Sequence, residues 1–276
     1  MKKCQIFVAC HKPCDVPNDN VYVPIHVGRS LSSYKLDMIG DDTGDNISNK
    51  NSTYCEITAL YWIWKNIRKS DVEYVGLCHY RRFFDFDFQK GDIDALFSNN
   101  TDVIIPAPHI RVNTLQHGLL LYISSDDFVI LKSVLKKKYP EYLKTMDKIL
   151  LGVKDYPYNM LICKKELFDN YCDWLFSILT ECEKLIKLSP YSRGKRVFGY
   201  MAEFLMPIYF IHNGYKYKTL ETVFIGENGP IVHRTNWKIK LVGAVVSAMF
   251  KMKKEAYMYD RAHLDALKND SIEIDL

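Results

Sequence analysis

Short apolar runs alternate along this chain with longer segments of helical periodicity, and this alternation limits the fold more than any other feature of the sequence. Runs with the length and composition of buried strands lie at 5–9, 73–78, 102–105, 159–163 and 217–224. Segments with a helical spacing of apolar residues cover 53–68, 125–138, 140–151, 165–188 and 198–213. Strands that alternate with helices form a mostly parallel sheet covered on both faces, with the binding site at the carboxyl ends of the strands. The sequence therefore predicts an α/β fold.

Composition and charge exclude several other classes of protein. With 48% hydrophobic and 25% charged residues among 276, the chain is neither disordered nor a coiled coil. Its net charge of +4 is too small to require a nucleic-acid partner, although it suits anionic ligands or an anionic membrane surface. The aromatic share of 13% suits stacking on rings and sugars, and a tyrosine-rich core is the alternative explanation.

The eight cysteines include no CxxC pair, and several lie inside apolar runs. This pattern favours reduced, buried thiols over disulfides or zinc, because Cys10, His11 and Cys14 have no second ligand pair downstream. The first apolar run is too short for a signal peptide, and no stretch reaches the roughly 20 apolar residues of a membrane span. We therefore expect a cytoplasmic protein.

Residues 11–52 are rich in Pro, Asn, Asp, Gly and Ser, so we predict little regular structure there. Loops of this length are usually functional or disordered. The segment 40–48 combines three acids with two glycines directly before a predicted helix, whose cap we place at 51–53 with Glu56 as the companion acid. Such a loop could bind calcium, but it lacks the spaced DxDxDG pattern with a distal Glu, and a plain acidic turn is the alternative.

A cationic group follows the predicted strand at 73–78. The residues are His79-Tyr80-Arg81-Arg82, and two guanidinium groups at a strand end suit a diphosphate, which they can hold by bidentate, charge-assisted hydrogen bonds. A solvated arginine pair is the alternative. The placement directly after a buried strand favours the anion site.

Glu203 lies inside an otherwise apolar predicted helix. A carboxylate in such a position is either paired with a cation such as Arg196 or held with a raised pKa as a general base. Weaker motifs include Asp85-Phe86-Asp87, a DxD of the kind that binds divalent metal in many nucleotide-sugar transferases and that also arises by chance. GxGxxG, GxxxxGK[ST] and GxSxG motifs are absent, which argues against dinucleotide-binding, P-loop and hydrolase folds.

Several blocks of the sequence resemble the signatures of a bacterial glycosyltransferase family. Its members belong to capsular, exopolysaccharide and O-antigen gene clusters, and it was long labelled only as a domain of unknown function. The matching blocks are HKP at 11–13, DDTGDNIS at 41–48, KN at 50–51, YCEITALYWIWKN at 54–66, GLCHYRRFF at 76–84, YNMLICKKELFDNYCDWLF at 158–176 and RVFGYMAEFL at 196–205. The resemblance covers roughly residues 5–226, and Cys10 stands where the family usually has Thr.

The resemblance implies transfer of a sugar, galactofuranose or galactose, from a UDP-sugar donor to a lipid-linked or polysaccharide acceptor in surface glycan synthesis. It implies a GT-A-like nucleotide-binding sheet flanked by helices. It also implies donor-binding roles for a set of polar residues: His11, Lys12, Asp41, Asp42, Asp45, Asn46, His79, Arg81, Arg82 and Asn159. Glu203 matches the late helix position where inverting GT-A enzymes carry their base.

The resemblance also bears on the metal requirement. In a GT-A transferase the metal-binding DxD follows the strand after the first long helix, and here His79, Arg81 and Arg82 stand at that place. The resemblance thus suggests that arginine supplies the charge neutralisation that Mn²⁺ supplies elsewhere. We predict no metal ligands and no required cofactor, with Mn²⁺ or Mg²⁺ stimulation left open and UDP-sugar as the co-substrate.

The composition changes most sharply after Pro230, which predicts a GT-A-like domain at 1–230 and a C-terminal helical extension at 231–276. Within the extension, 237–254 is an apolar segment with Lys238, Lys240, Lys251, Lys253 and Lys254 near its ends. The segment is too short and too charged to span a membrane comfortably, so we predict peripheral attachment to the anionic cytoplasmic face. A helix packed on the core or on a second subunit is the alternative.

Two other function classes compete with the transferase. One is a non-catalytic nucleotide-sugar or glycan-binding component of a polysaccharide assembly complex, which the intact polar blocks disfavour. The other is a metal-dependent hydrolase built on Asp41, Asp42 and Asp45, and the sequence lacks suitably spaced His ligands for it.

Overall fold

The structure is a computed structural model that describes residues 2–17, 20–88, 91–226, 229–232, 234, 236–252 and 261–274. Its strands are β1 (Lys2–Cys10), β2 (Tyr22–His26), β3 (Ile39–Gly40), β4 (Val72–His79), β5 (Arg82–Phe84), β6 (Val103–Pro106), β7 (His109–Ile110), β8 (Lys154–Asp155), β9 (Leu161–Lys164), β10 (Tyr217–Leu220), β11 (Thr222–Gly226) and β12 (Gly229–Val232). Its α-helices are α1 (Asn51–Tyr54), α2 (Ile57–Asn66), α3 (Ile93–Leu96), α4 (Leu115–Leu119), α5 (Ser125–Lys138), α6 (Leu143–Leu150), α7 (Lys165–Leu185), α8 (Val197–His212), α9 (Trp237–Phe250) and α10 (Arg261–Asn269). Short 3₁₀ turns are η1 (Arg29–Leu31), η2 (Ser48–Lys50), η3 (Pro140–Tyr142) and η4 (Gly194–Arg196).

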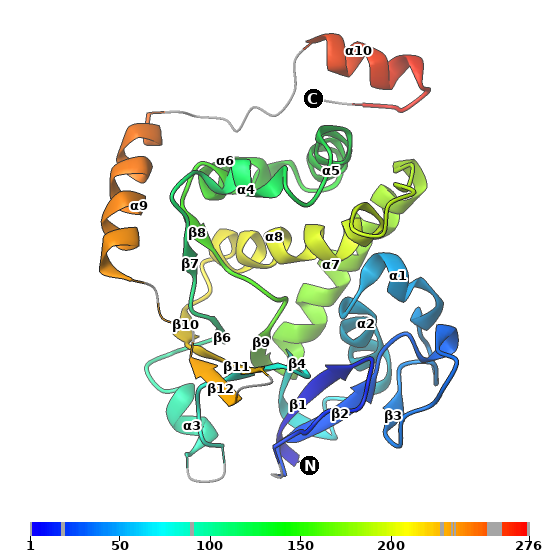
Figure 1. The fold of residues 1–276 in the computed structure, drawn as a ribbon, viewed down its shortest axis with the longest axis vertical. Helices are drawn as coiled ribbons and strands as arrows, with labels where there is room; N and C mark the ends of the chain where they lie inside the picture. Colours follow the sequence, from blue (N-terminus) through cyan, green and yellow to red (C-terminus); the bar gives the residue numbers. More distant parts are fainter. Residues whose placement is uncertain are drawn as a thin grey trace. The chain divides into compact units, whose positions relative to one another are not determined.

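The described residues form a central, mostly parallel sheet with the strand order β10-β6-β9-β4-β1-β2-β3 (Figure 1). Strand β9 is antiparallel to both of its neighbours, whereas β4, β1, β2 and β3 run parallel to one another. Strands β5, β11 and β12 extend the sheet by antiparallel pairing from the end of β4. The chain therefore has the predicted α/β fold, with a mostly parallel sheet flanked by helices.

Strand β1 lies in the interior of the sheet between β4 and β2. Ile6, Phe7 and Val8 are successive residues that point to alternate faces, yet each is at most 1% exposed. Burial on both faces explains why the strand is a continuous apolar run rather than an alternating one. The same reasoning holds for β4 and β9, whose positions the sequence also predicts.

The described chain divides into two compact units. The first comprises 1–108, 156–173 and 214–234 and contains the large sheet. The second comprises 109–155, 174–213 and 235–276, is mainly helical, and includes the β7–β8 pair. The predicted domain boundary at 230/231 stays a prediction.

Aromatic packing holds the interior of the second unit. Tyr142 stacks on His212 with ring centroids 3.9 Å apart, and Trp174 contacts both Tyr142 and Tyr209 at 5.0 and 5.1 Å. Such ring pairs add to the free energy of burial because their edges and faces carry opposite partial charges.

Three local predictions are wrong. The segment 11–52, for which little regular structure is predicted, contains β2, which pairs in parallel with β1, and β3, which pairs in parallel with β2. The predicted helix at 53–68 is broken at Cys55, whose φ of 54° and ψ of −138° are not helical. The predicted strand at 217–224 is two strands, because β10 pairs with β6 and β11 pairs with β5 on either side of Glu221.

All eight cysteines are free thiols; Cys14 and Cys55 are half-buried and the others are buried. The Sγ atoms of Cys10 and Cys14 lie 3.0 Å apart. No helix in the described part of the chain is long and apolar enough to cross a membrane.

We predict that Gly76→Ala destabilises the sheet. A Cβ at this position in β4 would lie 2.5 Å from the carbonyl oxygen of Leu161 in β9, and backbone cannot move aside cheaply. Overpacking of this kind costs about 1–3 kcal/mol of unfolding free energy, which urea denaturation followed by circular dichroism can measure. Gly226→Ala is the control, because its nearest neighbour at 3.1 Å is the ring of Phe224, a side chain. Equal stability of both variants would contradict the close approach.

Candidate functional site

The parallel strands of the first unit end at one edge of the sheet. Strands β1, β2 and β4 end at Cys10, His26 and His79, and the antiparallel β9 begins at this same edge just after Tyr158 and Asn159. In open α/β sheets ligands bind outside the carboxyl ends of the strands. The candidate site therefore lies at this edge of the sheet.

A network of polar contacts gathers Glu56, Asn159, His79 and the Tyr158 carbonyl at this edge. The Asn159 amide nitrogen donates to Glu56 Oε1 at 2.7 Å, and His79 Nε2 lies 2.6 Å from the Tyr158 carbonyl oxygen and 4.0 Å from Glu56 Oε1. A carbonyl only accepts, so His79 Nε2 carries a proton and donates this hydrogen bond. The side chains of His79 and Glu56 are only 14% and 11% exposed, so the network holds the end of β4 firmly.

Unusual backbone conformations place this network. Cys55, Tyr158 and Asn159 all have positive φ values, of 54°, 79° and 50°, which cost energy for residues other than glycine. The break at Cys55 separates α1 from α2 and precedes Glu56, and the turn at Tyr158 and Asn159 leads into β9. Such strain persists only where surrounding contacts determine it, and it is concentrated at functional sites.

Aromatic rings hold the Arg82 side chain. Its guanidinium carbon lies 4.4 Å from the centroid of the Tyr158 ring and 5.5 Å from that of Phe224. Stacking on rings restricts a guanidinium while leaving its N–H donors open at the edges. Within the described part of the chain, neither Arg82 nor Arg81 forms an ion pair with a carboxylate.

Tyr80 gathers three further groups around its ring. The Arg81 guanidinium lies 5.2 Å and the Lys12 ammonium 5.6 Å from the ring centroid, and the His11 ring contacts it edge-on at 4.8 Å. The His11 carbonyl accepts a hydrogen bond from the Tyr34 hydroxyl at 2.9 Å. The structure thus brings Lys12, after β1, together with Arg81, after β4, and with the neighbouring Arg82 these residues form a cationic cluster.

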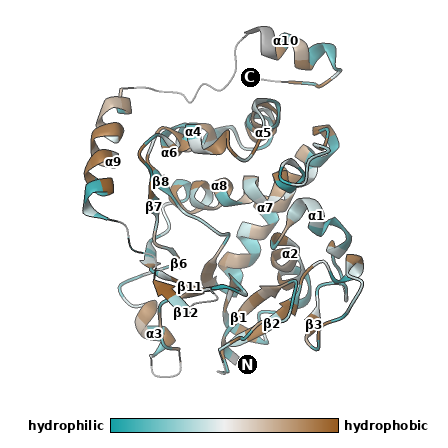
Figure 2. Ribbon diagram, in the orientation of Figure 1, coloured by the Kyte–Doolittle hydropathy of each residue, from teal (hydrophilic) through white to brown (hydrophobic). Residues whose placement is uncertain are grey.

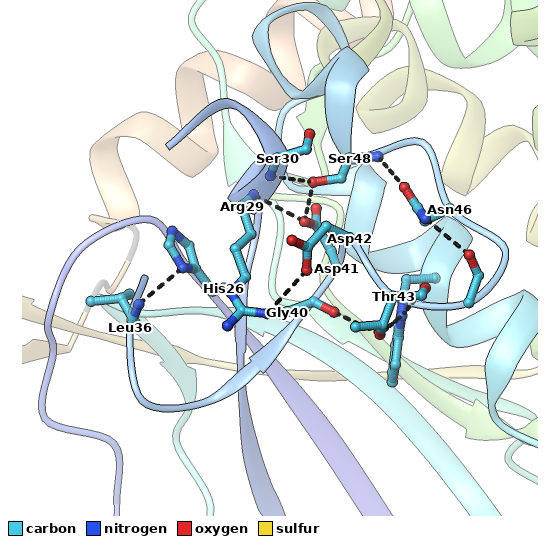
Figure 3. Close-up of polar contacts among 12 residues, drawn as sticks. His26, Arg29, Ser30, Leu36, Gly40, Asp41, Asp42, Thr43, Asn46 and Ser48 are labelled. Atoms are coloured by element: carbon cyan, nitrogen blue, oxygen red, sulfur yellow. Dashed lines mark hydrogen bonds and ion pairs between the residues drawn. The ribbon is translucent and has the colours of Figure 1, made fainter. Parts of the chain in front are cut away.

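The side chain of Asp41 is turned into the protein (Figure 3). The carboxylate is completely buried and accepts from the backbone N–H groups of Gly28 and Arg29, at 2.8 and 3.1 Å. It also accepts from the hydroxyl groups of Ser48 and Thr58, at 2.5 and 2.7 Å. These four donors occupy both oxygens, so Asp41 holds the loop in place, and its predicted contact with the sugar donor stays a prediction.

The neighbouring polar residues of this loop also serve its conformation. Asp42 accepts from the Arg29 guanidinium at 3.2 Å, as Figure 3 shows. Asp45 is exposed and accepts from the Tyr61 hydroxyl at 3.1 Å. Asn46 accepts from the Ser48 backbone N–H at 3.2 Å and donates to the Gly44 carbonyl. Donor-binding roles for Asp42, Asp45 and Asn46 stay predictions.

His26, at the end of β2, is 1% exposed, and its Nδ1 accepts from the Leu36 backbone N–H at 3.3 Å. Burial lowers the pKa of this imidazole, and nearby Arg29 lowers it further against the opposing effect of Asp41 and Asp42. A neutral His26 is the form that accepts this hydrogen bond. It thereby fixes the loop that carries Tyr34.

The DxD residues Asp85 and Asp87 line a cavity whose lining does not include the cationic cluster. Asp85 and Asp87 alternate with Phe84, Phe86 and Phe88 around a cavity of about 370 Å³. Among the residues described by the structure, no group of three or more His, Cys, Asp or Glu side chains is arranged to hold a metal ion. Glu203 lies half-buried on α8 of the second unit, and its role as a base stays a prediction.

The sequence predicts Glu56 only as a helix-capping residue. It does not predict the contact of Tyr158 with Arg82 or that of Arg29 with Asp42. Glu56 reaches a partner 103 residues away, and no local pattern reveals such a pairing. One feature of the sequence does point to Tyr158: it stands directly before Asn159 and the apolar run of β9, where a residue at the end of the sheet is expected.

We predict that Asp41→Asn destabilises the protein by about 3 kcal/mol or more, because the amide NH₂ would face N–H and O–H donors and leave buried groups unsatisfied. Asp45→Asn is the control, since this exposed side chain should change the unfolding free energy by no more than about 0.5 kcal/mol. Urea unfolding curves measure both. Wild-type stability of Asp41→Asn together with lost ligand binding would favour a direct ligand contact instead.

The model of a family described as a domain of unknown function, DUF4422, matches residues 5–214. No curated protein matches the chain.

A solved structure described as the apo form of WbbM, a bifunctional glycosyltransferase, is similar to this one, with a TM-score of 0.71 and 30% sequence identity. The similarity covers 82% of this chain and 46% of the WbbM chain, so the protein spans less than half the length of that relative. Because the family match extends over most of the sequence, including the whole cluster at the edge of the sheet, the chain belongs to the DUF4422 family.

Proposed function

We propose that this protein is a glycosyltransferase that moves a sugar, galactofuranose or galactose, from a UDP-sugar to a lipid-linked or polysaccharide acceptor in bacterial surface glycan synthesis. The observation that carries the proposal is the cationic cluster of Lys12, Arg81 and Arg82 at the carboxyl edge of β1 and β4. The similarity to a bifunctional glycosyltransferase over most of the chain supports the same class of reaction.

The cluster suits a departing diphosphate. In glycosyl transfer the acceptor oxygen bonds to the anomeric carbon while the bond from that carbon to the diphosphate oxygen breaks, so negative charge develops on UDP. Arg81 and Arg82 offer N–H donors at the sheet edge where a nucleotide would lie, and Lys12 adds a third positive charge. Preorganised cations of this kind stabilise the leaving group without rearrangement during the reaction.

The buried network has a positioning role in this proposal. Glu56 and Asn159 link α2 to the entry of β9, and the His79 ring is tied to the same turn through Tyr158. The ring of Tyr158 in turn supports the Arg82 guanidinium. The Arg82 guanidinium is therefore held on a rigid support, and rigid placement is what makes an anion site effective.

We further propose that the reaction needs no divalent metal. Mn²⁺ in other transferases neutralises the diphosphate, and the arginine pair can supply this charge here. Glu203 on α8 is the proposed base, which takes the proton from the acceptor hydroxyl if the reaction inverts the anomeric centre.

We expect Arg81→Ala and Arg82→Ala each to weaken UDP binding about tenfold or more, because a charge-assisted hydrogen bond contributes about 1.5–3 kcal/mol. Lysine at either position keeps the charge, loses the planar fork and should recover only part of the affinity. Calorimetric titration in the presence of EDTA measures the affinity and tests metal independence at once.

Arg68→Ala is the matched control for this titration, since Arg68 is an exposed arginine of the same unit, ion-paired to Asp71 before β4. Unchanged UDP affinity in both test variants would contradict the diphosphate role. Binding seen only after Mn²⁺ is added would contradict metal independence and direct attention to Asp85 and Asp87.

We expect the wild-type protein to release UDP from a UDP-sugar when a lipid-linked acceptor is present, and Glu203→Gln to bind UDP normally but lose turnover. The amide keeps the shape of the side chain and cannot accept the proton. Glu141→Gln, an exposed substitution in the same unit, controls for a general effect of removing a carboxylate. UDP binding by the wild type without any release above background would instead identify a non-catalytic binding component. Near wild-type turnover of Glu203→Gln would remove this residue from the mechanism.

A further inference from the structure

We propose that α9 is a membrane-docking helix that lies in the interfacial region of an anionic lipid bilayer. The inference concerns where the protein binds lipid and does not depend on glycosyl transfer. It extends the sequence-based prediction for residues 237–254 by assigning the face of the helix that meets the lipid. The contacts of α9, its exposed side chains and its charges carry the argument.

One narrow face of α9 packs on the second unit. Gly243 is its one buried residue, and a Cβ there would lie 2.5 Å from the Ile110 side chain and 3.4 Å from that of Val153. Val246 and Phe250, three and seven residues further on, are half-buried on this same side. The supporting β7–β8 pair is closed by an ion pair of 2.8 Å between Arg111 and Asp155.

The opposite face of α9 presents large apolar side chains to solvent, and Figure 2 shows the hydrophobic colour along much of this helix. Residues at spacings of four share a helix face, and four such residues on α9 are strongly exposed. They are Trp237 at 67%, Leu241 at 60%, Val245 at 55% and Met249 at 73% exposed. Met252, just beyond the helix, is 92% exposed. Contiguous exposed apolar side chains of this size mark an interaction surface.

Charge identifies the occupant of this surface. Lys238, Lys240 and Lys251 are exposed, and residues 237–254 contain no Asp or Glu. The remaining lysines of the prediction, Lys253 and Lys254, lie outside the described residues. An apolar stripe that carries lysines and no acids, with a tryptophan at one end, complements anionic headgroups above an acyl layer.

A second copy of this chain is a poorer occupant. Symmetric contact through the same face would place lysines of one α9 near lysines of the other, and no acidic residue of the helix could compensate. A bilayer-spanning arrangement is excluded by length, since the 14 residues of α9 extend about 21 Å at 1.5 Å per residue, against a hydrocarbon core of about 30 Å. The helix therefore lies along the membrane plane.

The helix is already formed before it meets lipid. The Asn236 side chain caps α9 by accepting from the Lys238 backbone N–H at 2.9 Å. Most interfacial peptides fold only on the membrane and spend binding free energy on that ordering. A capped helix, held by Gly243 against β7, avoids this cost and presents its apolar face in one orientation.

Vesicle flotation of the full chain at low salt tests the proposal. We expect the wild type to float with vesicles of equal phosphatidylcholine and phosphatidylglycerol, and to remain unbound with phosphatidylcholine alone. Three substitutions, Leu241→Ser, Val245→Ser and Met249→Ser, made together should lower the vesicle affinity about tenfold or more, because they remove inserted apolar area. The matched control is Ile231→Ser with Val232→Ser, which removes exposed apolar side chains from β12.

A second set of variants tests the charges. Lys238→Glu, Lys240→Glu and Lys251→Glu made together should lower the affinity for anionic vesicles about a hundredfold or more, since each lysine near such a surface contributes about a fivefold factor. Lys164→Glu, Lys216→Glu and Lys218→Glu change the net charge equally at exposed positions of the first unit. Circular dichroism and thermal melting confirm that each variant is folded.

Tryptophan fluorescence reports on the helix itself. Vesicles should shift the emission of the wild type to the blue, and Trp237→Phe should remove most of this shift while leaving flotation largely intact. The proposal would be overturned by no flotation of the folded wild type, by equal loss of binding in test and control variants, or by a blue shift that persists in Trp237→Phe. A concentration-dependent dimer that the serine variants dissociate, without vesicle binding, would also overturn it and identify a second copy as the occupant. Titration with UDP, which requires no lipid, separates these failures from a failure of the proposed function.

Discussion

The candidate site depends on the hydrogen bonds that the buried carboxylate of Asp41 accepts. A carboxylate removed from water needs hydrogen-bond donors for its lone pairs, and Asp41 takes them from η1, from Ser48 and from Thr58 on α2. One side chain thus joins the segment after β2, the segment after β3 and the first turn of α2. Because α2 begins directly after Glu56, the same interaction also helps to locate the carboxylate that binds Asn159.

The cationic cluster at the sheet edge is held by aromatic rings instead of by hydrogen bonds to a described carboxylate. Its positive groups rest on aromatic rings, Arg82 on Tyr158 and both Arg81 and Lys12 on Tyr80, and no described carboxylate neutralises the two arginines. Rings restrict these long side chains while leaving their N–H groups accessible, so less conformational entropy is lost when an anion binds. A permanent ion pair would have held the arginines equally well but would have competed with a phosphate for the same donors.

Helix α9 differs from the other described α-helices because most of its large apolar side chains are exposed. Its apolar side chains are not needed for the core, since only Gly243 is buried, and a glycine at the contact brings the helix axis close to β7 without using an apolar side chain. The free energy available from burying Trp237, Leu241, Val245 and Met249 is therefore still available for a partner. Binding to lipid through this face and binding of a nucleotide at the sheet edge use separate residues, which is why the experiments can address them independently.

The sequence by itself determined the α/β class and the positions of β1, β4, β6 and β9, because strands buried on both faces are continuous apolar runs. It also located α5 without error and the cationic group after β4. The short strands β2 and β3 were not predicted, since Pro24 and polar neighbours give a loop-like composition to the segment in which β2 pairs with β1 and β3 pairs with β2. Only the tertiary structure decided that Asp41 points inward, that the helix breaks at Cys55, and that Glu56 meets Asn159 from 103 residues away. Local patterns report how much apolar surface a segment can bury, whereas the direction of a polar side chain depends on donors and acceptors that other parts of the chain bring to it.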